Sequence, residues 1–166
     1  MVICGVDPGL NITGYGVIRA EGLHVELCEG GAVRPKGRRP LEQRLGDLYR
    51  GMCEVLADCS PGVIAVEELY STYEHPRTAI LMGHARGVVY LAAAEAGIPV
   101  VGYTATTVKK ALTGSGHATK AQMQAMVQRA LDLCEPPEPP DVADALALAI
   151  CHANSLRHGL PDWMRR

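Results

Sequence analysis

The sequence predicts an α/β protein in which helices flank a mixed β-sheet. Two observations lead to this prediction: three strand-like segments precede the first helical one, and helical and strand-like segments alternate afterwards. The chain has 166 residues, of which 48% are apolar and 20% charged. That length and balance are typical of one globular domain with its own core. We expect this domain to span residues 1–158 and residues 159–166 to be a frayed tail.

The first half of the chain carries four predicted strands and one helix. An apolar run at residues 2–7 ends in Asp7-Pro8-Gly9, which predicts a buried strand that delivers one carboxylate to the edge of the sheet. Apolar residues at helical spacing predict a helix from Leu41 to about Cys59, before the breaker Ser60-Pro61-Gly62. The other strands are expected at 14–20 and 23–33, joined by a hairpin at Glu21-Gly22, and at 63–66, before Glu67-Glu68.

The second half is mainly helical. A loop from Leu69 to Pro76 carries Tyr70 and Tyr73, and a long apolar helix is expected over residues 77–96. The proline-rich segment from Glu135 to Pro140 cannot be helical, so it separates the last two helices. A fifth strand is expected at 97–101, and further helices at 104–112, 120–133 and 141–157.

Two segments admit two interpretations each. In the long helix, Gly83 and Gly87 lie one turn apart on the same face, and small residues there let another helix approach closely. That helix belongs either to the core of the same chain or to a second copy. The basic segment from Arg34 to Arg39 is either a solvated linker or a contact for phosphate.

Composition restricts the class of protein. The net charge of −2 argues against a sequence-independent nucleic-acid coat, although it leaves room for a local basic surface. No apolar stretch reaches the length of a membrane helix, and no secretory signal pattern opens the chain. The six cysteines show no paired spacing, which favours reduced thiols in a cytoplasmic protein.

Three separate predicted elements bring carboxylates toward buried positions. Asp7 and either Glu67 or Glu68 follow apolar strands, and Asp141 and Asp144 share one face of the last helix. Asp141 alone also suits an N-cap after the prolines, whereas Asp144 lies one turn inside a buried helix. If these acids meet, their mutual repulsion calls for divalent cations, and oxygen ligands select Mg²⁺ or Mn²⁺. Two such ions about 4 Å apart would suit phosphodiester hydrolysis.

These residues resemble the RuvC family of bacterial Holliday-junction resolvases. The resemblance extends from about residue 2 to residue 153. It rests on seven segments that match in order and spacing: Gly5-Val-Asp7-Pro-Gly9, Thr13-Gly-Tyr-Gly-Val-Ile18, Ala65-Val-Glu67, Gly83-His-Ala-Arg86-Gly87, Val108-Lys109, Gly114-Ser-Gly116 and Asp141-Val-Ala-Asp144-Ala-Leu-Ala.

The resemblance implies an RNase H-like fold with a five-stranded mixed sheet, which works as a homodimer. It implies that Asp7, Glu67, Asp141 and Asp144 form a catalytic tetrad that holds two Mg²⁺ or Mn²⁺ ions, and it selects Glu67 over Glu68. It further implies paired, symmetric cleavage of four-way junction DNA in recombination and repair, with a RuvA and RuvB branch-migration complex as partner.

The resemblance also assigns residues that contact DNA. Tyr70 stands where the family has an aromatic residue near the crossover, here Tyr rather than Phe, and Lys109 and Lys120 match lysines near the scissile phosphate. Lys120 counts as catalytic as well. Because a lysine at a helix start opposes the helix dipole, we expect an anionic partner for it. We expect Lys110 to be an exposed helix residue and His117 a surface histidine, and Arg77 and Arg86 to cap or pair on the long helix.

Three other functions are compatible with parts of the pattern. A related RNase H-like nuclease would act on a different nucleic acid. An actin-like ATPase also begins with a strand, an aspartate and a glycine turn, but this chain is too short for the two such domains of that fold and lacks a second phosphate-binding turn. A catalytically inactive junction-binding scaffold would not need four acids.

Overall fold

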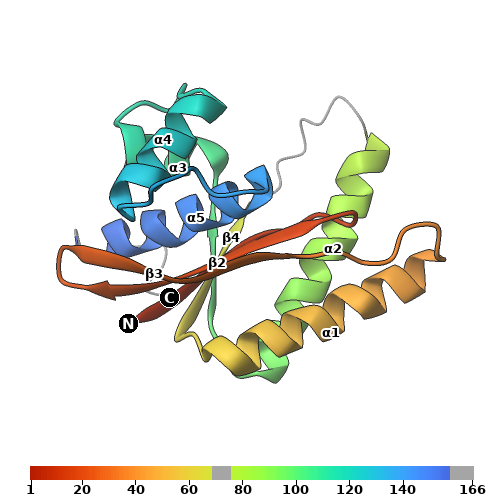
Figure 1. Cartoon of the computed structure of the whole chain (residues 1–166). Coiled ribbons are helices and arrows are strands. Elements are labelled where there is room, and N and C mark those ends of the chain that lie inside the picture. The colour runs from red at the N-terminus through yellow and green to blue at the C-terminus, as the bar shows by residue number, and fades with distance from the viewer. Residues whose placement is uncertain (69–75, 158–166) are drawn as a thin grey trace.

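A five-stranded mixed sheet forms the centre of the molecule (Figure 1). The computed structural model describes residues 1–68 and 76–157, without the side chain of Pro76. The strands are β1 (Val2–Asp7), β2 (Thr13–Glu21), β3 (His24–Val33), β4 (Val63–Glu67) and β5 (Val100–Tyr103), in the spatial order β3-β2-β1-β4-β5. The pairs β1/β2 and β2/β3 are antiparallel, and β1/β4 and β4/β5 are parallel. The predicted α/β architecture with a mixed sheet is confirmed.

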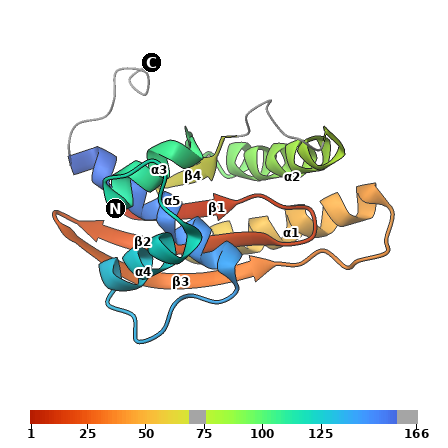
Figure 2. The ribbon, with the colours of Figure 1, turned by 90° about the horizontal axis from the view of Figure 1, so that it is seen from above.

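Helices cover both faces of the sheet (Figure 2). On one face α5 (Pro140–Arg157) packs against β1 and β2, with α3 (Ala105–Thr113) and α4 (Lys120–Ala130) beside it. On the other face lie α1 (Leu41–Cys59) and α2 (Pro76–Glu95). Each face has its own buried apolar cluster, and strand residues that alternate in direction contribute to both clusters.

Helix α5 lies unusually close to the sheet because glycines replace side chains beneath it. A Cβ atom on Gly5 would overlap the carbonyl of Ala145, and one on Gly14 would overlap the carbonyl of Asp141. From Val142 to Ala153 only Asp144 keeps more than slight exposure. This close packing fixes the first turn of α5 against the end of β1.

The structure corrects two predicted boundaries. The strand expected at 97–101 begins only at Val100, because Gly97 adopts a left-handed φ of 67° and the N–H of Ile98 returns to the carbonyl of Ala93. Helix α4 ends at Ala130 rather than at residue 133, since Asp132 also turns left-handed.

Prolines begin two of the helices. Pro76 opens α2 and Pro140 opens α5, so the proline-rich segment that we expected to exclude helix contributes the first residue of α5. A proline at the first helical position loses no hydrogen bond there and already has a helical φ.

Some predictions fall outside the described residues. These are the loop with Tyr70 and Tyr73 and the tail at 159–166. Within the described part of the chain, no helix is long and apolar enough to cross a membrane. All six cysteines lie in that part, and each is a free thiol.

Candidate active site

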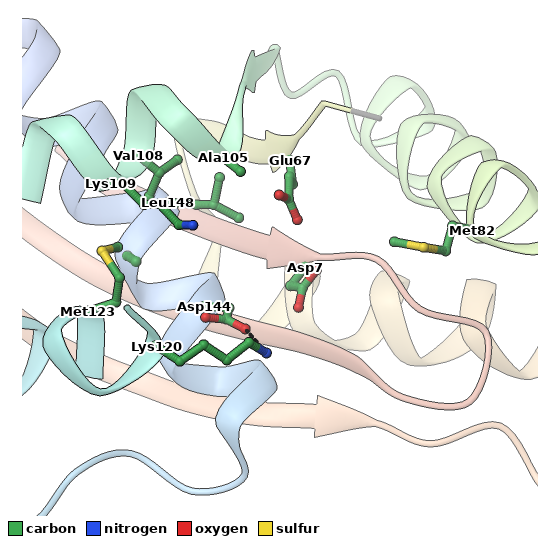
Figure 3. Close-up of a pocket in the computed structure, with 11 residues that line it drawn as sticks. Asp7, Glu67, Met82, Ala105, Val108, Lys109, Lys120, Met123, Asp144 and Leu148 are labelled. Carbon is green, nitrogen blue, oxygen red and sulfur yellow. Dashed lines mark ion pairs between the residues drawn. The ribbon is translucent and has the colours of Figure 1, made fainter. Parts of the chain in front are cut away.

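A cleft of about 360 Å³ lies where β1, β4, α3, α4 and α5 meet (Figure 3). Its polar lining comprises Asp7, Glu67, Asp144, Lys109 and Lys120. The apolar lining includes side chains of α2, α3, α4 and α5, namely Met82, Ala105, Val108, Met123, Ala147 and Leu148. Three of the four predicted acids and both predicted lysines therefore share one cleft.

The topology of the sheet explains why the two strand acids meet. Strands β1 and β4 are parallel neighbours with Val6 opposite Val66, so Asp7 and Glu67 end their strands at the same edge. Glu67 lines the cleft, whereas the Glu68 side chain lies where a Cβ atom on Gly102 would be. The structure thus places Glu67 in the cleft and Glu68 against β5.

The acids of α5 approach from above this edge. Asp144 enters the cleft, while Asp141 lines an adjoining groove together with Asp7. Asp141 is already the second residue of the helix, so it is not the N-cap that the sequence also allowed. Gly14, which pairs with Asp7 across β1 and β2, lies directly beneath Asp141.

Burial and mutual repulsion disfavour ionisation of the acids. Burial above all, and then the charges of Glu67, Asp144 and Asp141, raise the pKa of Asp7 to about 7, although Lys120 opposes this shift. Burial followed by the charge of Asp144 raises the pKa of Glu67. The pKa of Asp144 is raised mainly by burial, against the opposing charge of Lys120.

Lysines on α3 and α4 face the acids. Lys120 Nζ lies 3.8 Å from Asp144 Oδ2. Asp144 is therefore an anionic partner of the kind that we predicted for a lysine at a helix start. The lysine is 83% exposed on its side chain, so the amine can also reach a substrate. Lys109 is half-buried and lines the cleft, while Lys110 is exposed as predicted.

The carboxylate oxygens of the cleft suit a hard divalent cation, but they do not lie in the positions of a complete coordination sphere. In residues 1–68 and 76–157, no three histidine, cysteine, aspartate or glutamate side chains stand close enough together to hold one ion. The oxygen donors and their repulsion nevertheless fit Mg²⁺ or Mn²⁺, because a cation would offset the cost of ionising Asp7 beside the other acids.

Two arginines position the ends of the strands. Arg86 donates from Nε to the carbonyl of Glu67 at 3.1 Å and from Nη2 to the hydroxyl of Tyr90 at 2.7 Å, which confirms the prediction that it pairs on the long helix. Arg44 donates from Nη2 to Leu10 O at 3.1 Å and to Asn11 Oδ1 at 2.7 Å. The role of Arg44 was missed, since no local pattern reveals a contact between residues so far apart in the sequence.

The other predicted contact residues do not line the cleft. His117 is exposed, in agreement with its prediction as a surface histidine, and Arg77 is exposed on the first turn of α2. Tyr70, the predicted aromatic contact, belongs to the segment 69–75 outside the described residues.

Comparison with protein families and known relatives gives one consistent result. A family model described as crossover junction endodeoxyribonuclease RuvC matches residues 3–152. The crossover junction endodeoxyribonuclease RuvC of Rhodopirellula baltica is 50% identical over 149 residues, which cover 90% of this chain and 84% of the relative. That of Desulforamulus reducens is 48% identical over 153 residues, with 92% and 93% covered.

Solved structures agree with the sequence relatives. The structure of Thermus thermophilus RuvC superimposes with a TM-score of 0.88 at 40% identity, covering 96% of this chain and 97% of that one. The same protein in complex with a Holliday junction substrate gives 0.87 at 38% identity, with the same coverage. The yeast mitochondrial resolvase Ydc2 shares the fold with a TM-score of 0.63 at 14% identity. These similarities confirm the predicted RNase H-like fold.

Proposed function

The chain belongs to the RuvC family of crossover junction endodeoxyribonucleases, and we propose how its residues carry out the reaction of that family. It is a structure-specific endonuclease that resolves Holliday junctions in DNA recombination and repair. The observation that carries our proposal is the cleft in which Asp7, Glu67 and Asp144 face Lys109 and Lys120.

In this proposal Asp7, Glu67, Asp141 and Asp144 are the catalytic acids and hold two divalent cations, Mg²⁺ or Mn²⁺. Such ions supply Lewis-acid activation of water and stabilise the charge that develops on the leaving oxygen of a phosphodiester. The support is the chemistry of the donors and the cost of ionising Asp7 among other acids. Asp141 would contribute its carboxylate from the adjoining groove, which it lines together with Asp7.

The lysines act on the substrate rather than on the acids alone. Lys120 is bound to Asp144 at 3.8 Å in the free protein, and its exposed amine can exchange this carboxylate for the scissile phosphate. Such an exchange would release Asp144 to serve as a ligand and would place a positive charge against the DNA. Lys109 lines the same cleft from α3 and would hold the same strand in place. Tyr70 is proposed, by resemblance, to stack on bases near the crossover.

We propose that the enzyme is a homodimer joined through α2. The groove along this helix is lined by Ile80, Gly83, His84, Gly87, Val88 and Leu91. Ile80 is 60% and Leu91 52% exposed, and among the described residues nothing beyond the helix's own backbone lies within 4 Å of a Cβ built on Gly83 or Gly87. Of the two interpretations of these glycines, the free groove favours the seam between copies. A two-fold dimer would present two identical sites to opposed strands.

Further parts of the proposal rest on family membership alone. A RuvA and RuvB branch-migration complex would deliver the junction. The enzyme would act in the cytoplasm, where bacterial DNA lies.

Strand-resolved cleavage of a synthetic mobile four-way junction tests the proposal, with a linear duplex of the same sequence beside it. We expect symmetric paired nicks on the junction in Mg²⁺ or Mn²⁺, no nicks in EDTA, and at least a thousandfold loss of rate in Asp144→Asn. Equal cutting of the duplex would contradict junction specificity. Full activity in EDTA would contradict the role of the ions.

A further inference from the structure

The basic loop at residues 34–40 lies at the same end of the sheet as the catalytic acids. Strand β3 ends at Val33 opposite Thr13, and Thr13 opens the strand on which Gly14 pairs with Asp7. The chain therefore leaves the sheet at the edge where Asp7 sits and runs past the β1–β2 loop into α1 (Figures 1 and 2). No function described above uses this loop.

The loop concentrates positive charge in an acidic protein. Residues 34–50 hold six basic and two acidic residues, a net charge of +4, whereas the whole chain has a net charge of −2. The four basic side chains of the loop are all exposed: Arg34, Lys36, Arg38 and Arg39. Within the described residues, Arg39 is the only one of the four that forms an ion pair with a carboxylate, Asp47, at 3.4 Å.

The loop is held in one shape rather than left as a free linker. Asp47 on α1 accepts the backbone N–H of Lys36 at 3.3 Å and also binds Arg39 and Arg50. Pro35 is buried. At the tip Arg38 has a φ of 63°, a left-handed conformation that glycine adopts more easily than arginine. A charged residue therefore occupies a position where backbone energy favours glycine.

A groove beside the catalytic cleft reaches α1, the helix that follows the loop. Its lining includes Asp7 and Asp141, together with Asn11 of the β1–β2 loop and Arg44 of α1. Arg44 stands in the first turns of α1, directly after the loop, and its two hydrogen bonds fix the segment around Leu10. A strand whose scissile phosphate lies at Asp7 can thus continue along this groove toward the loop.

We infer that the basic loop binds the phosphate backbone of a duplex arm of the junction, beyond the catalytic cleft. This inference rests on the proposed function, because it takes the substrate of that site as its partner. The loop adds salt-dependent affinity for DNA of any sequence. Lysine and arginine side chains that bind phosphates do not contact the bases, so they do not distinguish one base from another. Its side chains do not touch the reacting phosphate.

Binding of four-way junctions to the full-length protein in EDTA tests the inference over a series of salt concentrations. The triple variant Arg34→Gln, Lys36→Gln, Arg38→Gln should lower the slope of log affinity against log salt by about 2 to 3, at about 0.9 for each lost phosphate contact. At low salt it should bind long-armed junctions at least about tenfold more weakly. With arms shortened below one helical turn, about 10 base pairs, the difference should disappear.

Two single variants separate charge from folding. Arg38→Gly removes one charge and relaxes the left-handed backbone, so it should lower the slope by about 0.9 with no loss of thermal stability. Arg19→Gln is the matched control, because Arg19 is exposed on β2 at the end of the sheet opposite to Asp7. It should leave the slope unchanged.

Three results would overturn the inference: an unchanged slope in the triple variant, an equal loss in Arg19→Gln, or a loss that persists at full size on short arms. Cleavage in Mg²⁺ is measured separately on the same junctions. If the wild-type protein binds with the expected slopes but cuts nothing, the proposed function fails while the loop contact stands. If it cuts junctions but the slopes do not move, only the loop contact fails.

Discussion

Helices α5 and α2 cover opposite faces of the same sheet and differ in how completely they are buried. Both are largely apolar, yet α5 has no exposed residue between Val142 and Ala153, while α2 leaves Ile80 and Leu91 more than half exposed. The glycines make the same contrast. Gly14 under α5 has no room for a Cβ, whereas a Cβ on Gly83 in α2 would meet no other part of the described chain. Helix α5 is buried within the chain and fixes the acids that we propose to be catalytic, whereas α2 leaves the apolar groove that we propose as the dimer seam.

The largest expected effect concerns the acids that line the cleft beside α5. Glu67→Gln should lower the junction cleavage rate at least a thousandfold. The change removes a proposed carboxylate ligand of the divalent cations while keeping the shape of the side chain. Glu68→Gln is the matched control and should retain most activity, since that side chain lies against β5. Single-turnover cleavage measures both, and equal losses would remove the distinction between the two residues.

Gly14→Ala should break the close contact between α5 and the sheet. The new methyl group would overlap the backbone of Asp141, so we expect the free energy of unfolding to fall by about 3 kcal/mol, or more than a hundredfold in the unfolding constant. In a single, undimerised subunit, Gly83→Ala should cost nothing and can gain up to about 1 kcal/mol in a helix interior. Urea unfolding compares the two, and similar values would mean that the two faces are packed alike.

Asp7, on the sheet beneath α5, carries a cost of buried charge, which predicts a dependence on pH. The folded-state pKa of Asp7, about 7, lies above its unfolded value of 3.8, so the native state holds the proton between these values. The contribution of Asp7 to the stability of the metal-free protein should therefore be fully present below the unfolded pKa and be lost as the pH rises toward 7, by about 4 kcal/mol. Mg²⁺ should restore it above pH 7.

Asp7→Asn is the control for this pH profile. It should flatten the profile, raise the melting temperature in EDTA by several degrees and still bind junctions. A profile that is unchanged in Asp7→Asn would assign the pH dependence to other groups. Loss of junction binding in this variant would mean that Asp7 is structural.

The smallest effect concerns the α2 groove. Gly87→Glu places a charge in open space, so it should leave the stability of a single subunit within about 0.5 kcal/mol. It should weaken dimerisation at least tenfold in sedimentation experiments, because two buried carboxylates would face each other across the seam. A variant that remains a stable dimer would rule out this groove as the interface.

Most of the fold was predictable from the sequence because the signals that define its elements are local. Apolar periodicity located the helices and strands, and the acids that follow apolar strands indicated Asp7 and the Glu67-Glu68 pair as candidates for the site. The errors lay at two boundaries. Gly97 ends the long helix, as a glycine in that position suggests, but the strand begins only at Val100, and no periodicity reveals the left-handed turn at Asp132. The site was less predictable where it depends on long-range contacts, as with Arg44 and the β1–β2 loop.

The separation of Asp141 from the cleft was also unpredictable from the sequence. The i and i+3 spacing places Asp141 and Asp144 on one face, but the packing of α5 on Gly14 decides that they line two adjoining spaces. The choice of Glu67 over Glu68 came from the family resemblance, because both follow the same apolar run.

Acids from three separate segments are proposed to act together on divalent cations, and the binding of Mn²⁺ tests this most directly. Titration of the protein with Mn²⁺, followed by electron paramagnetic resonance of the free ion, needs no substrate. We expect the wild-type protein to bind the ion and each of Asp7→Asn, Glu67→Gln, Asp141→Asn and Asp144→Asn to bind it at least tenfold more weakly, with Glu68→Gln unchanged. Binding that survives in all four variants would contradict the joint role of the acids.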